Sequence, residues 1–594
     1  MTLYHPSFLA TLSSILLAVH LVVTHTNSLP LPPSPQSNPN NATVPVSAST
    51  VCQSTQYPSY CKNILQSGNN NTSSNVYEYG RFSFKRSVSQ ASKFLKLINK
   101  YLHNSRKLKL TPSAIGALQD CQFLAELNVD FLNTSYNAVN TKLNKTLSYT
   151  TADDVQTFLS GILTNLQTCL DGVKSVESAW SFDRGITSPL SSDTKLYSIS
   201  LALFTKAWIP KKKKGSNLTP RGKTHKGFFG SGRGGGGRIP GLNMSENARA
   251  VFKKSLSRHH ERLLASNNND DDDQVNIYDV VTVSQDGSGN FSTINDAITA
   301  APNKTEESDG YYLIYVTAGV YDEIVSIDKK KRYIMMIGDG INQTIITGNR
   351  SVADNFTTFQ SATFAVTGTG FVGMNMTIRN TAGAIKHQAV ALRSGADLSA
   401  FYSCSFEGYQ DTLYVHSLRQ FYRECDIYGT VDFIFGNANV VFQNCNIYPR
   451  LPLDKQFNAI TAQGRTDPNQ NTGIAINNCV IRAADDLASN NGTTKTYLGR
   501  PWKEYSRTVY LESYIDNVVD PAGWREWDGN FALDTLYYGE FNNSGPSSNV
   551  TNRVNWAGYH VMNVTDAVNF TVSTFVFGDE WLPQTGVPYM SGLL

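Results

Sequence analysis

Two aspartates, Asp411 and Asp432, are the residues of this sequence whose spacing points most clearly to chemistry. They lie 21 positions apart, and Gln388 lies 23 positions before the first of them. If one coil of a repeating fold separates each from the next, two carboxylates become neighbours beside an amide donor. Two adjacent carboxylates repel each other when both are ionised, so one is driven toward its protonated form. Such a pair can supply an acid together with a base or nucleophile, although a single aspartate can also merely cap a turn.

A repeat of about 20 residues indicates the fold that would align them. A cysteine followed two places later by an apolar residue recurs in four segments, which are Ser403–Phe406, Glu424–Ile427, Asn444–Ile447 and Asn478–Ile481. A steady period in β-rich sequence is typical of a solenoid whose coils stack about 4.8 Å apart, so that equivalent residues form columns. The stacked cysteines would point inward within disulfide reach, but the period does not choose which pair is joined.

Short β-like runs support the same interpretation, at Tyr312–Val316, Tyr333–Ile337 and Phe364–Val366. A sandwich of ordinary hairpins is less favoured, because turn pairs of the Asn-Gly type do not separate these runs.

The same segments resemble the signature segments of plant pectin methylesterases. The resemblance covers residues 275–594 and rests on Gly319–Glu323, Gln388–Arg393, Gln410–Leu413, Asp432–Gly436, Leu498–Trp502, Trp581–Pro583 and Thr585–Tyr589. It implies a right-handed parallel β-helix that hydrolyses the methyl esters of homogalacturonan, the pectin backbone, to methanol and free carboxylate.

The resemblance also implies a role for each matching residue. Asp432 would attack the C6 carbonyl as nucleophile, and Asp411 would protonate the departing methanol and then deprotonate the incoming water. Gln388 and Gln410 would donate hydrogen bonds to the oxyanion, each typically worth about 3 kcal/mol. Arg500 would pair with Asp432 and keep it ionised.

Further residues are implied in substrate binding and in a disulfide. Thr358, Gln388, Arg500 and Trp502 would contact the substrate, with the indole face against a sugar ring, and Cys425 would be joined to Cys445. The mechanism implies no metal and no cofactor. The sequence contains neither an HExxH zinc motif nor a G-x-S-x-G nucleophile elbow, so a zinc or serine esterase has no support.

Residues 48–208 predict an all-α, antiparallel four-helix bundle. Apolar residues recur at three and four positions from Val155 to Cys169 and from Leu118 to Leu132, and Thr151 is a candidate helix cap. Two cysteine pairs are expected as disulfides, Cys52 with Cys61 and Cys121 with Cys169. The domain resembles the pectin methylesterase inhibitor domain that precedes many of these enzymes.

Three further segments indicate export and processing. Residues 1–28 read as a signal peptide, with an uncleaved signal anchor as the alternative. Residues 209–274 read as a disordered linker, basic and Gly-rich and then acidic, although its Lys and Arg could bind a polyanion. The resemblance implies cleavage by a subtilisin-like protease, for which Arg262, Leu263 and Leu264 are the candidate site, with Glu261 where a second basic residue is common.

The charge composition limits the kinds of partner that we expect this protein to bind. The 594 residues carry 51 Lys and Arg against 48 Asp and Glu, so a net charge of +3 gives no reason to expect nucleic acid. We expect a secreted cell-wall glycoprotein that binds methyl-esterified pectin and proteinaceous pectinesterase inhibitors and is a monomer after processing. Two alternatives are a β-helix glycanase that uses the same aspartates, and a non-enzymatic role in which the helical domain inhibits other esterases.

Overall fold

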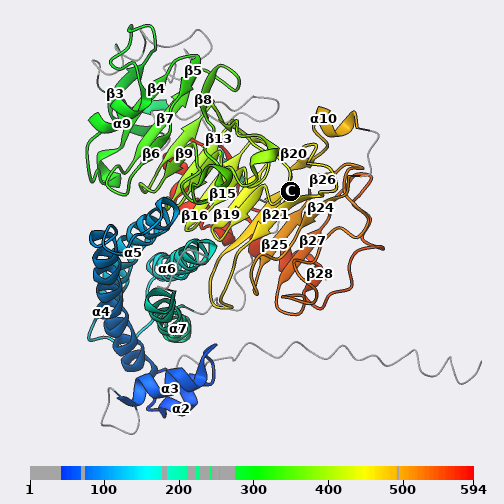
Figure 1. The fold of residues 1–594 in the computed structure, drawn as a ribbon. Helices are drawn as coiled ribbons and strands as arrows, with labels where there is room; N and C mark the ends of the chain where they lie inside the picture. The colour runs from blue at the N-terminus through cyan, green and yellow to red at the C-terminus, as the bar shows by residue number, and fades with distance from the viewer. Residues whose placement is uncertain are drawn as a thin grey trace, which may run out of the picture.

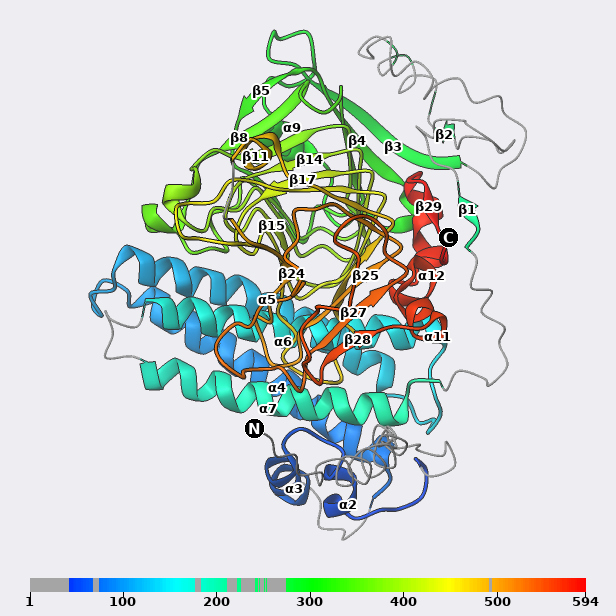
Figure 2. The ribbon, with the colours of Figure 1, turned by 90° about the vertical axis from the view of Figure 1, so that its right-hand side faces the viewer.

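The computed structural model describes two folded parts, a helical bundle and a β-helix (Figures 1 and 2). The described residues are 42–67, 74–176, 183–210, 222–225, 241–243, 245, 250, 253, 274–490 and 494–594. The predicted signal peptide and the candidate cleavage site at 262–264 lie outside them. Within the described part of the chain, no helix is long and apolar enough to cross a bilayer.

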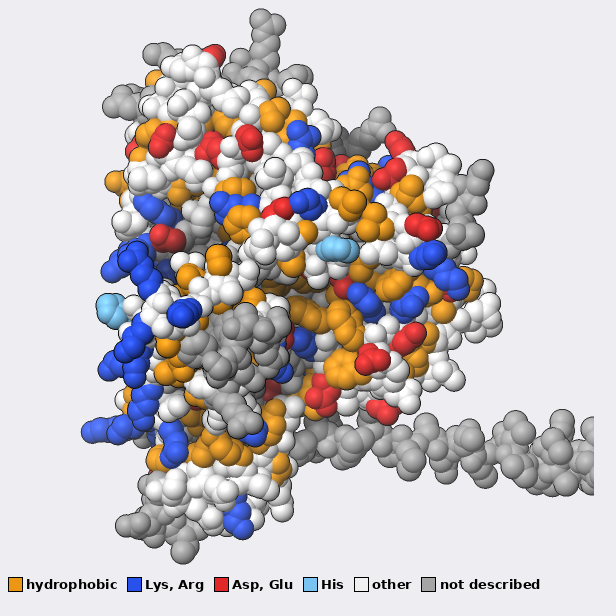
Figure 3. Space-filling model, in the orientation of Figure 1, with side chains coloured by type: hydrophobic (Ala, Val, Ile, Leu, Met, Phe, Trp, Pro, Cys, Tyr) orange, Lys and Arg blue, Asp and Glu red, His pale blue; other side chains and the backbone are white. Residues whose placement is uncertain are grey.

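The N-terminal part is the predicted four-helix bundle, preceded by two short helices. Its helices are α2 (Ala48–Cys52), α3 (Pro58–Ser67), α4 (Val76–His103), α5 (Pro112–Val139), α6 (Tyr149–Ser175) and α7 (Asp183–Ala207). The long helices pack in a ring, α4 on α5, α5 on α6, α6 on α7 and α7 back on α4. Lys and Arg side chains gather along the outer edge of the bundle, over α4 (Figure 3).

Polar caps set where these helices begin. The Asn75 and Thr111 side chains accept hydrogen bonds from backbone amides in the first turns of α4 and α5. The predicted cap at Thr151 is wrong by one turn, because Ser148 caps α6 and accepts from the Thr151 amide. Serine caps a helix as well as threonine does, and the apolar pattern from Val155 onward did not show where the first turn of α6 begins.

Both predicted disulfides of the bundle are present. Cys52 and Cys61 join α2 to α3 with their Cα atoms 5.6 Å apart. Cys121 and Cys169, which lie 48 positions apart in sequence, join α5 to α6 with Cα atoms 4.7 Å apart. The second bond ties together two helices that pack directly on each other.

The C-terminal part is the predicted parallel β-helix, in which each complete coil contributes one strand to each of three sheets, and the first sheet extends beyond the other two at both ends. The first sheet contains β2 (Gly241–Asn243), β3 (Gln274–Val283), β4 (Tyr311–Val316), β7 (Ile334–Gly338), β10 (Val372–Met374), β13 (Ser399–Tyr402), β16 (Arg419–Arg423), β19 (Asn439–Gln443), β22 (Gly473–Asn477), β25 (Arg507–Leu511), β27 (Tyr537–Phe541) and β28 (Tyr559–Val561). The second contains β5 (Gly319–Asp322), β8 (Thr344–Gly348), β11 (Thr377–Asn380), β14 (Ser405–Glu407), β17 (Asp426–Gly429), β20 (Asn446–Pro449), β23 (Val480–Ile481) and β26 (Tyr514–Ile515). The third contains β6 (Val325–Ile327), β9 (Phe364–Val366), β12 (Leu392–Ser394), β15 (Leu413–Val415), β18 (Ile434–Gly436), β21 (Asn458–Gln463) and β24 (Thr496–Gly499).

Short helices complete this part. An early helix, α9 (Ile294–Ala300), packs on β3, β4 and β6. Apolar residues near the C-terminus, from Phe570 to Leu593, cover the outer face of the first sheet. The helices of the C-terminal half are α10 (Asp485–Ala488), α11 (Val564–Ala567), α12 (Val572–Phe575) and α13 (Gly578–Trp581).

The four cysteines of the repeat do stack, but they are free thiols, so the predicted bond between Cys425 and Cys445 is wrong for this structure. Each cysteine precedes a strand of the second sheet, and these strands pair in register. The stacked side chains point the same way, and the Cys425 thiol donates to the Arg423 carbonyl, 3.3 Å away. A disulfide needs the two Cβ–S bonds turned about 90° from each other, which parallel stacking does not supply.

The predicted linker is not uniformly irregular. Within 209–274, β1 (Thr224–His225) pairs antiparallel with β29 (Tyr589–Met590), and β2 extends the first sheet beside β3. The Gly222 amide donates to the Leu593 carbonyl at 2.8 Å. Composition alone suggested disorder, but strand pairing satisfies backbone hydrogen-bonding groups in these two short segments.

Candidate active site

Asp411 and Asp432 lie at equivalent positions of adjacent coils. Each occupies the bend between the second and third sheets, two residues before β15 and β18, whose first residues, Leu413 and Ile434, pair in register. The Asp411 amide donates to the Val431 carbonyl at 3.1 Å, which locks the two bends together. Both aspartates have left-handed backbone conformations, with φ of 63° and 54°. Aspartate tolerates this region better than most residues, so the bends can hold carboxylates side by side.

Arg500 divides the charge unequally between the two carboxylates. It follows β24, and its Nε and Nη2 donate to the two carboxylate oxygens of Asp432 at 2.8 and 2.6 Å. Burial raises the pKa of Asp432, and this arginine opposes that rise. Burial, and then the charge of Asp432, raise the pKa of Asp411 well above its usual range. The arrangement therefore favours an ionised Asp432 beside a protonated Asp411.

All of the predicted site residues line one cavity of about 350 Å³. The two aspartates and Arg500 meet there with the predicted amide donors and substrate contacts, which are Thr358, Gln388, Gln410 and Trp502. Among the described residues, no group of three or more His, Cys, Asp or Glu side chains is arranged to hold a metal ion.

Aromatic residues form much of the remaining wall, and sequence reasoning missed most of them. Tyr414 and Phe435 stack with ring centroids 4.2 Å apart, and the Arg500 guanidinium lies 4.3 Å from the Trp527 ring centroid. Tyr414 and Phe435 follow Asp411 and Asp432 by three positions, so the same period could have identified them. Phe359 and Trp527 lie on irregular loops, where no period applies.

The helical bundle closes this cavity from the other side. Its contribution to the lining comes from α5 and α6, at Asp120, Thr168, Asp171, Gly172 and Ser175. Small residues allow the approach, since a Cβ on Gly161 of α6 would lie 2.8 Å from a methyl carbon of Leu418 on the β-helix. The Lys503 ammonium, next to Trp502, pairs with Asp171 at 2.9 Å.

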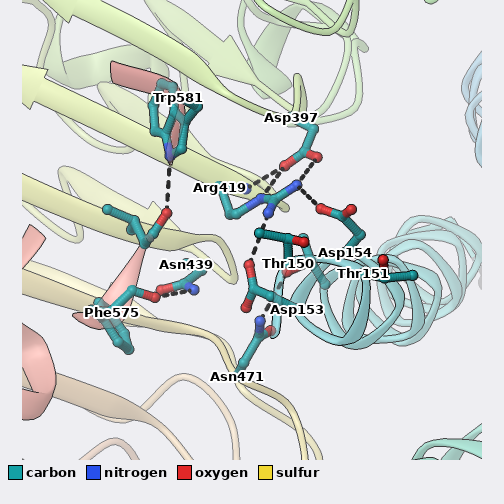
Figure 4. Close-up of polar contacts among 12 residues, drawn as sticks. Thr150, Thr151, Asp153, Asp154, Asp397, Arg419, Asn439, Asn471, Phe575 and Trp581 are labelled. Atoms are coloured by element: carbon teal, nitrogen blue, oxygen red, sulfur yellow. Dashed lines mark hydrogen bonds and ion pairs between the residues drawn. The ribbon is translucent and has the colours of Figure 1, made fainter. Parts of the chain in front are cut away.

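A buried ion cluster fastens the two parts together (Figure 4). Arg419 of β16 contacts Asp397 of the β-helix at 2.7 Å. The same guanidinium contacts Asp153 and Asp154 at the start of α6, each at 2.8 Å. Because the arginine and Asp153 are buried, removing one partner would leave an uncompensated charge.

Comparisons with known proteins agree with this architecture. The pectinesterase family model matches residues 280–579, and the plant invertase/pectin methylesterase inhibitor model matches residues 47–203. Probable pectinesterase/pectinesterase inhibitor 41 of Arabidopsis thaliana is 60% identical over 555 residues, which are 92% of this chain and 95% of that protein. Probable pectinesterase/pectinesterase inhibitor 7 of the same plant is 59% identical over 559 residues, which are 92% of this chain and 95% of that protein.

A solved structure matches the β-helix alone. Pectin methylesterase from carrot superposes with a TM-score of 0.52 at 54% identity, covering 53% of this chain and 98% of its own. The chain therefore belongs to the plant pectinesterases, carboxylic ester hydrolases that carry an N-terminal pectinesterase inhibitor domain.

Proposed function

We propose that this pectinesterase is an aspartyl esterase in which Asp432 forms a covalent acyl-enzyme. A carboxylate oxygen of Asp432 attacks the C6 carbonyl carbon of a methyl-esterified galacturonate, and Gln388 and Gln410 donate hydrogen bonds to the resulting oxyanion. Asp411 gives its proton to the departing methoxy group. The same residue then takes a proton from water, which hydrolyses the acyl-enzyme and releases free carboxylate.

The observation that carries this proposal is the two-point contact of Arg500 with Asp432 beside a buried second carboxyl. It supports the unequal protonation that the mechanism requires, since a nucleophile must be charged while its neighbour holds a proton. Two equally placed carboxylates would give no such assignment.

The test of the reaction is product analysis with methyl-esterified homogalacturonan. We expect the chain, cut between its domains and freed of its inhibitor domain, to release methanol without shortening the polysaccharide. Asp432→Asn should reduce the rate by at least about a thousandfold, because an amide cannot be the nucleophile. New reducing ends without methanol would instead support a glycanase using the same pair.

We also propose that the inhibitor domain keeps the uncut chain inactive. The support is the position of α5 and α6, which close the cavity that holds both aspartates. Methanol release should rise when the chain is cut between the domains and the inhibitor domain is removed. Equal rates before and after would reject the proposal.

We propose, third, where the inhibitor domain is cut from the esterase and which class of protease cuts it. Two disulfides and many Asn-x-Ser/Thr sequons support secretion to the cell wall, where methyl-esterified pectin is the substrate. A subtilisin-like protease acting at Arg262–Leu264 would cut the chain between the two domains. Replacing these three residues by Gly-Ser-Gly should leave the chain uncut in plant tissue.

A further inference from the structure

We propose that Thr357, Gln360 and Arg393 form a binding site for a free carboxylate of the pectin chain, and that Asp120 of the inhibitor domain occupies this site in the precursor. The inference rests on the proposed function, since its ligand is a galacturonate unit that has already lost its methyl ester. It makes the inhibitor domain a mimic of partly de-esterified substrate.

The Asp120 carboxylate is held at both oxygens by the esterase. The Thr357 hydroxyl donates to one oxygen at 2.6 Å, and the Gln360 amide nitrogen donates to the other at 2.8 Å. The same amide nitrogen donates to the Gly116 carbonyl of α5, also at 2.8 Å. Two separate donors on one carboxylate are typical of a recognition site for an anion.

The turn that carries these donors is held within the esterase. The Gln360 backbone amide donates to the Thr357 hydroxyl oxygen at 3.1 Å, so the hydroxyl proton is left to point at the carboxylate. The backbone amides of Gln360 and Ser361 both donate to the Thr357 carbonyl at 3.0 Å, which closes the turn. None of these bonds involves the inhibitor domain, so the turn that carries both donors is held by the esterase alone.

Arg393 adds positive charge behind the donors. Its side chain is buried, its Nε donates to the Phe359 carbonyl at 3.0 Å, and its guanidinium carbon lies 3.4 Å from the Phe359 ring centroid. Its Nη1 has no hydrogen-bond partner among the residues that the structure describes. A buried cation with an unpaired N–H is costly unless an anion approaches.

Three groups of the esterase favour the charged form of Asp120 against the cost of its burial. Burial raises the pKa of Asp120 to about 6, and the hydrogen bonds from Thr357 and Gln360 and the charge of Arg393 oppose this rise. At neutral pH the group is therefore an anion held by a cation and two donors.

The carboxylate site and the catalytic pair share one space. Thr357 and Asp120 line the same 350 Å³ cavity as Asp411 and Asp432. Once the inhibitor domain has left, a sugar unit with a free carboxylate can bind the donors while a nearby esterified unit faces the nucleophile. The enzyme should therefore prefer esters close to units that it has already de-esterified.

The test compares two substrates on the full chain, cut at a protease site that replaces residues 262–264 and freed of its inhibitor domain. One substrate is highly methyl-esterified homogalacturonan, and the other is the same polymer partly de-esterified by mild alkali. The readout is the ratio of kcat/KM per ester for the second over the first. Gln360→Glu, which places a negative charge against the carboxylate, should lower this ratio about tenfold.

Matched variants control for fold and for charge. Gln343→Glu adds the same charge at an exposed position before β8 and should keep the wild-type ratio. Thr357→Val should lower the ratio, and Thr357→Ser, which restores a hydroxyl, should recover it. Equal ratios for Gln360→Glu and Gln343→Glu in folded protein would overturn the proposal.

A binding measurement separates this proposal from the esterase mechanism. Trigalacturonate, which has no ester, should bind the cut Asp432→Asn chain, freed of its inhibitor domain, at least about tenfold more weakly when Gln360→Glu is added. Unchanged affinity would reject the carboxylate site. Failure of the wild-type chain to release methanol from either polymer would instead reject the proposed reaction while leaving the binding result standing.

Discussion

At the scale of single residues, the chemistry depends on which member of a carboxylate pair holds the charge. Asp411 and Asp432 are close to equivalent in backbone position, and only the second is bound by Arg500 at both oxygens. The planar guanidinium of Arg500 matches the two oxygens of a carboxylate, which a lysine ammonium does not. Removing it should therefore change both the protonation of Asp432 and the orientation of its carboxylate.

Replacing Arg500 should shift the acidic limb of the pH–rate profile. Arg500→Gln removes the charge that opposes a raised Asp432 pKa, so a higher pH is needed to ionise the nucleophile and the limb moves to higher pH. Arg500→Lys, which keeps the charge without the fork, should move it less while lowering kcat about 10- to 100-fold. The measurement is kcat against pH for the cut chain freed of its inhibitor domain. An acidic limb that does not move in Arg500→Gln would contradict the assignment of Asp432 as the ionised nucleophile.

Asp120 should make the hold of the inhibitor domain dependent on pH. Its pKa is raised to about 6 in the closed structure from an ordinary value of 3.8, so closure takes up a proton between these values. The stabilisation is complete below about pH 4 and is lost as the pH rises through 6. The cut domains should therefore separate faster at pH 7 than at pH 5, as followed by gel filtration, and Asp120→Asn should flatten that difference.

At the scale of elements, the bends between sheets position the site. The residue before each stacked cysteine adopts a left-handed conformation, at Ser403, Glu424, Asn444 and Asn478. Asp411 and Asp432 do so at the next corner. These bends repeat once per coil, which is why a spacing of 21 residues places two side chains in one column.

Counting thiols tests the stacked cysteines. The structure has two disulfides, both in the bundle, and four free cysteines in the β-helix. Protein denatured without reductant should therefore react with a thiol reagent at four sites per chain. A count of two would show that a bond forms within the stack, as the family resemblance implied for Cys425 and Cys445.

Periodicity explains how far the sequence could predict the site. Asp411, Asp432 and the cysteine stack follow from one period, and the family motifs add Arg500, Gln410 and the substrate contacts. The loop residues Phe359 and Trp527 and the contact of Asp120 with Thr357 have no such signal, because tertiary packing brings irregular segments together. Composition misjudged part of the linker for a related reason, since β1 is ordered by pairing with a distant C-terminal strand.

At the scale of the whole molecule, α5 and α6 form the face of the bundle that lines the cavity together with the β-helix (Figure 2). The Arg419 cluster, the pair of Lys503 with Asp171, and the Asp120 site lie along this face. The strands β1 and β2 add a second connection upstream of the candidate cleavage site. Cutting the chain should therefore not by itself separate the domains.

Two adjacent aspartates allow a matched test of this interface. Asp153 is buried against Arg419, whereas the side chain of Asp154 is 45% exposed. Asp153→Asn should weaken closure and raise methanol release by the uncut chain, because Arg419 loses a buried partner. Asp154→Asn should have little effect, since a solvated pair contributes at most about 1 kcal/mol. Equal effects would show that the cluster does not hold the domains together.

The most direct test of the mechanism is to locate the covalent intermediate. The cut chain, freed of its inhibitor domain, is mixed with methyl-esterified oligogalacturonide, quenched in acid during turnover, digested and mapped by mass spectrometry. We predict an added galacturonate mass on the peptide that contains Asp432 and none on Asp411. An adduct on the Asp411 peptide, or full methanol release by Asp432→Asn, would contradict the account.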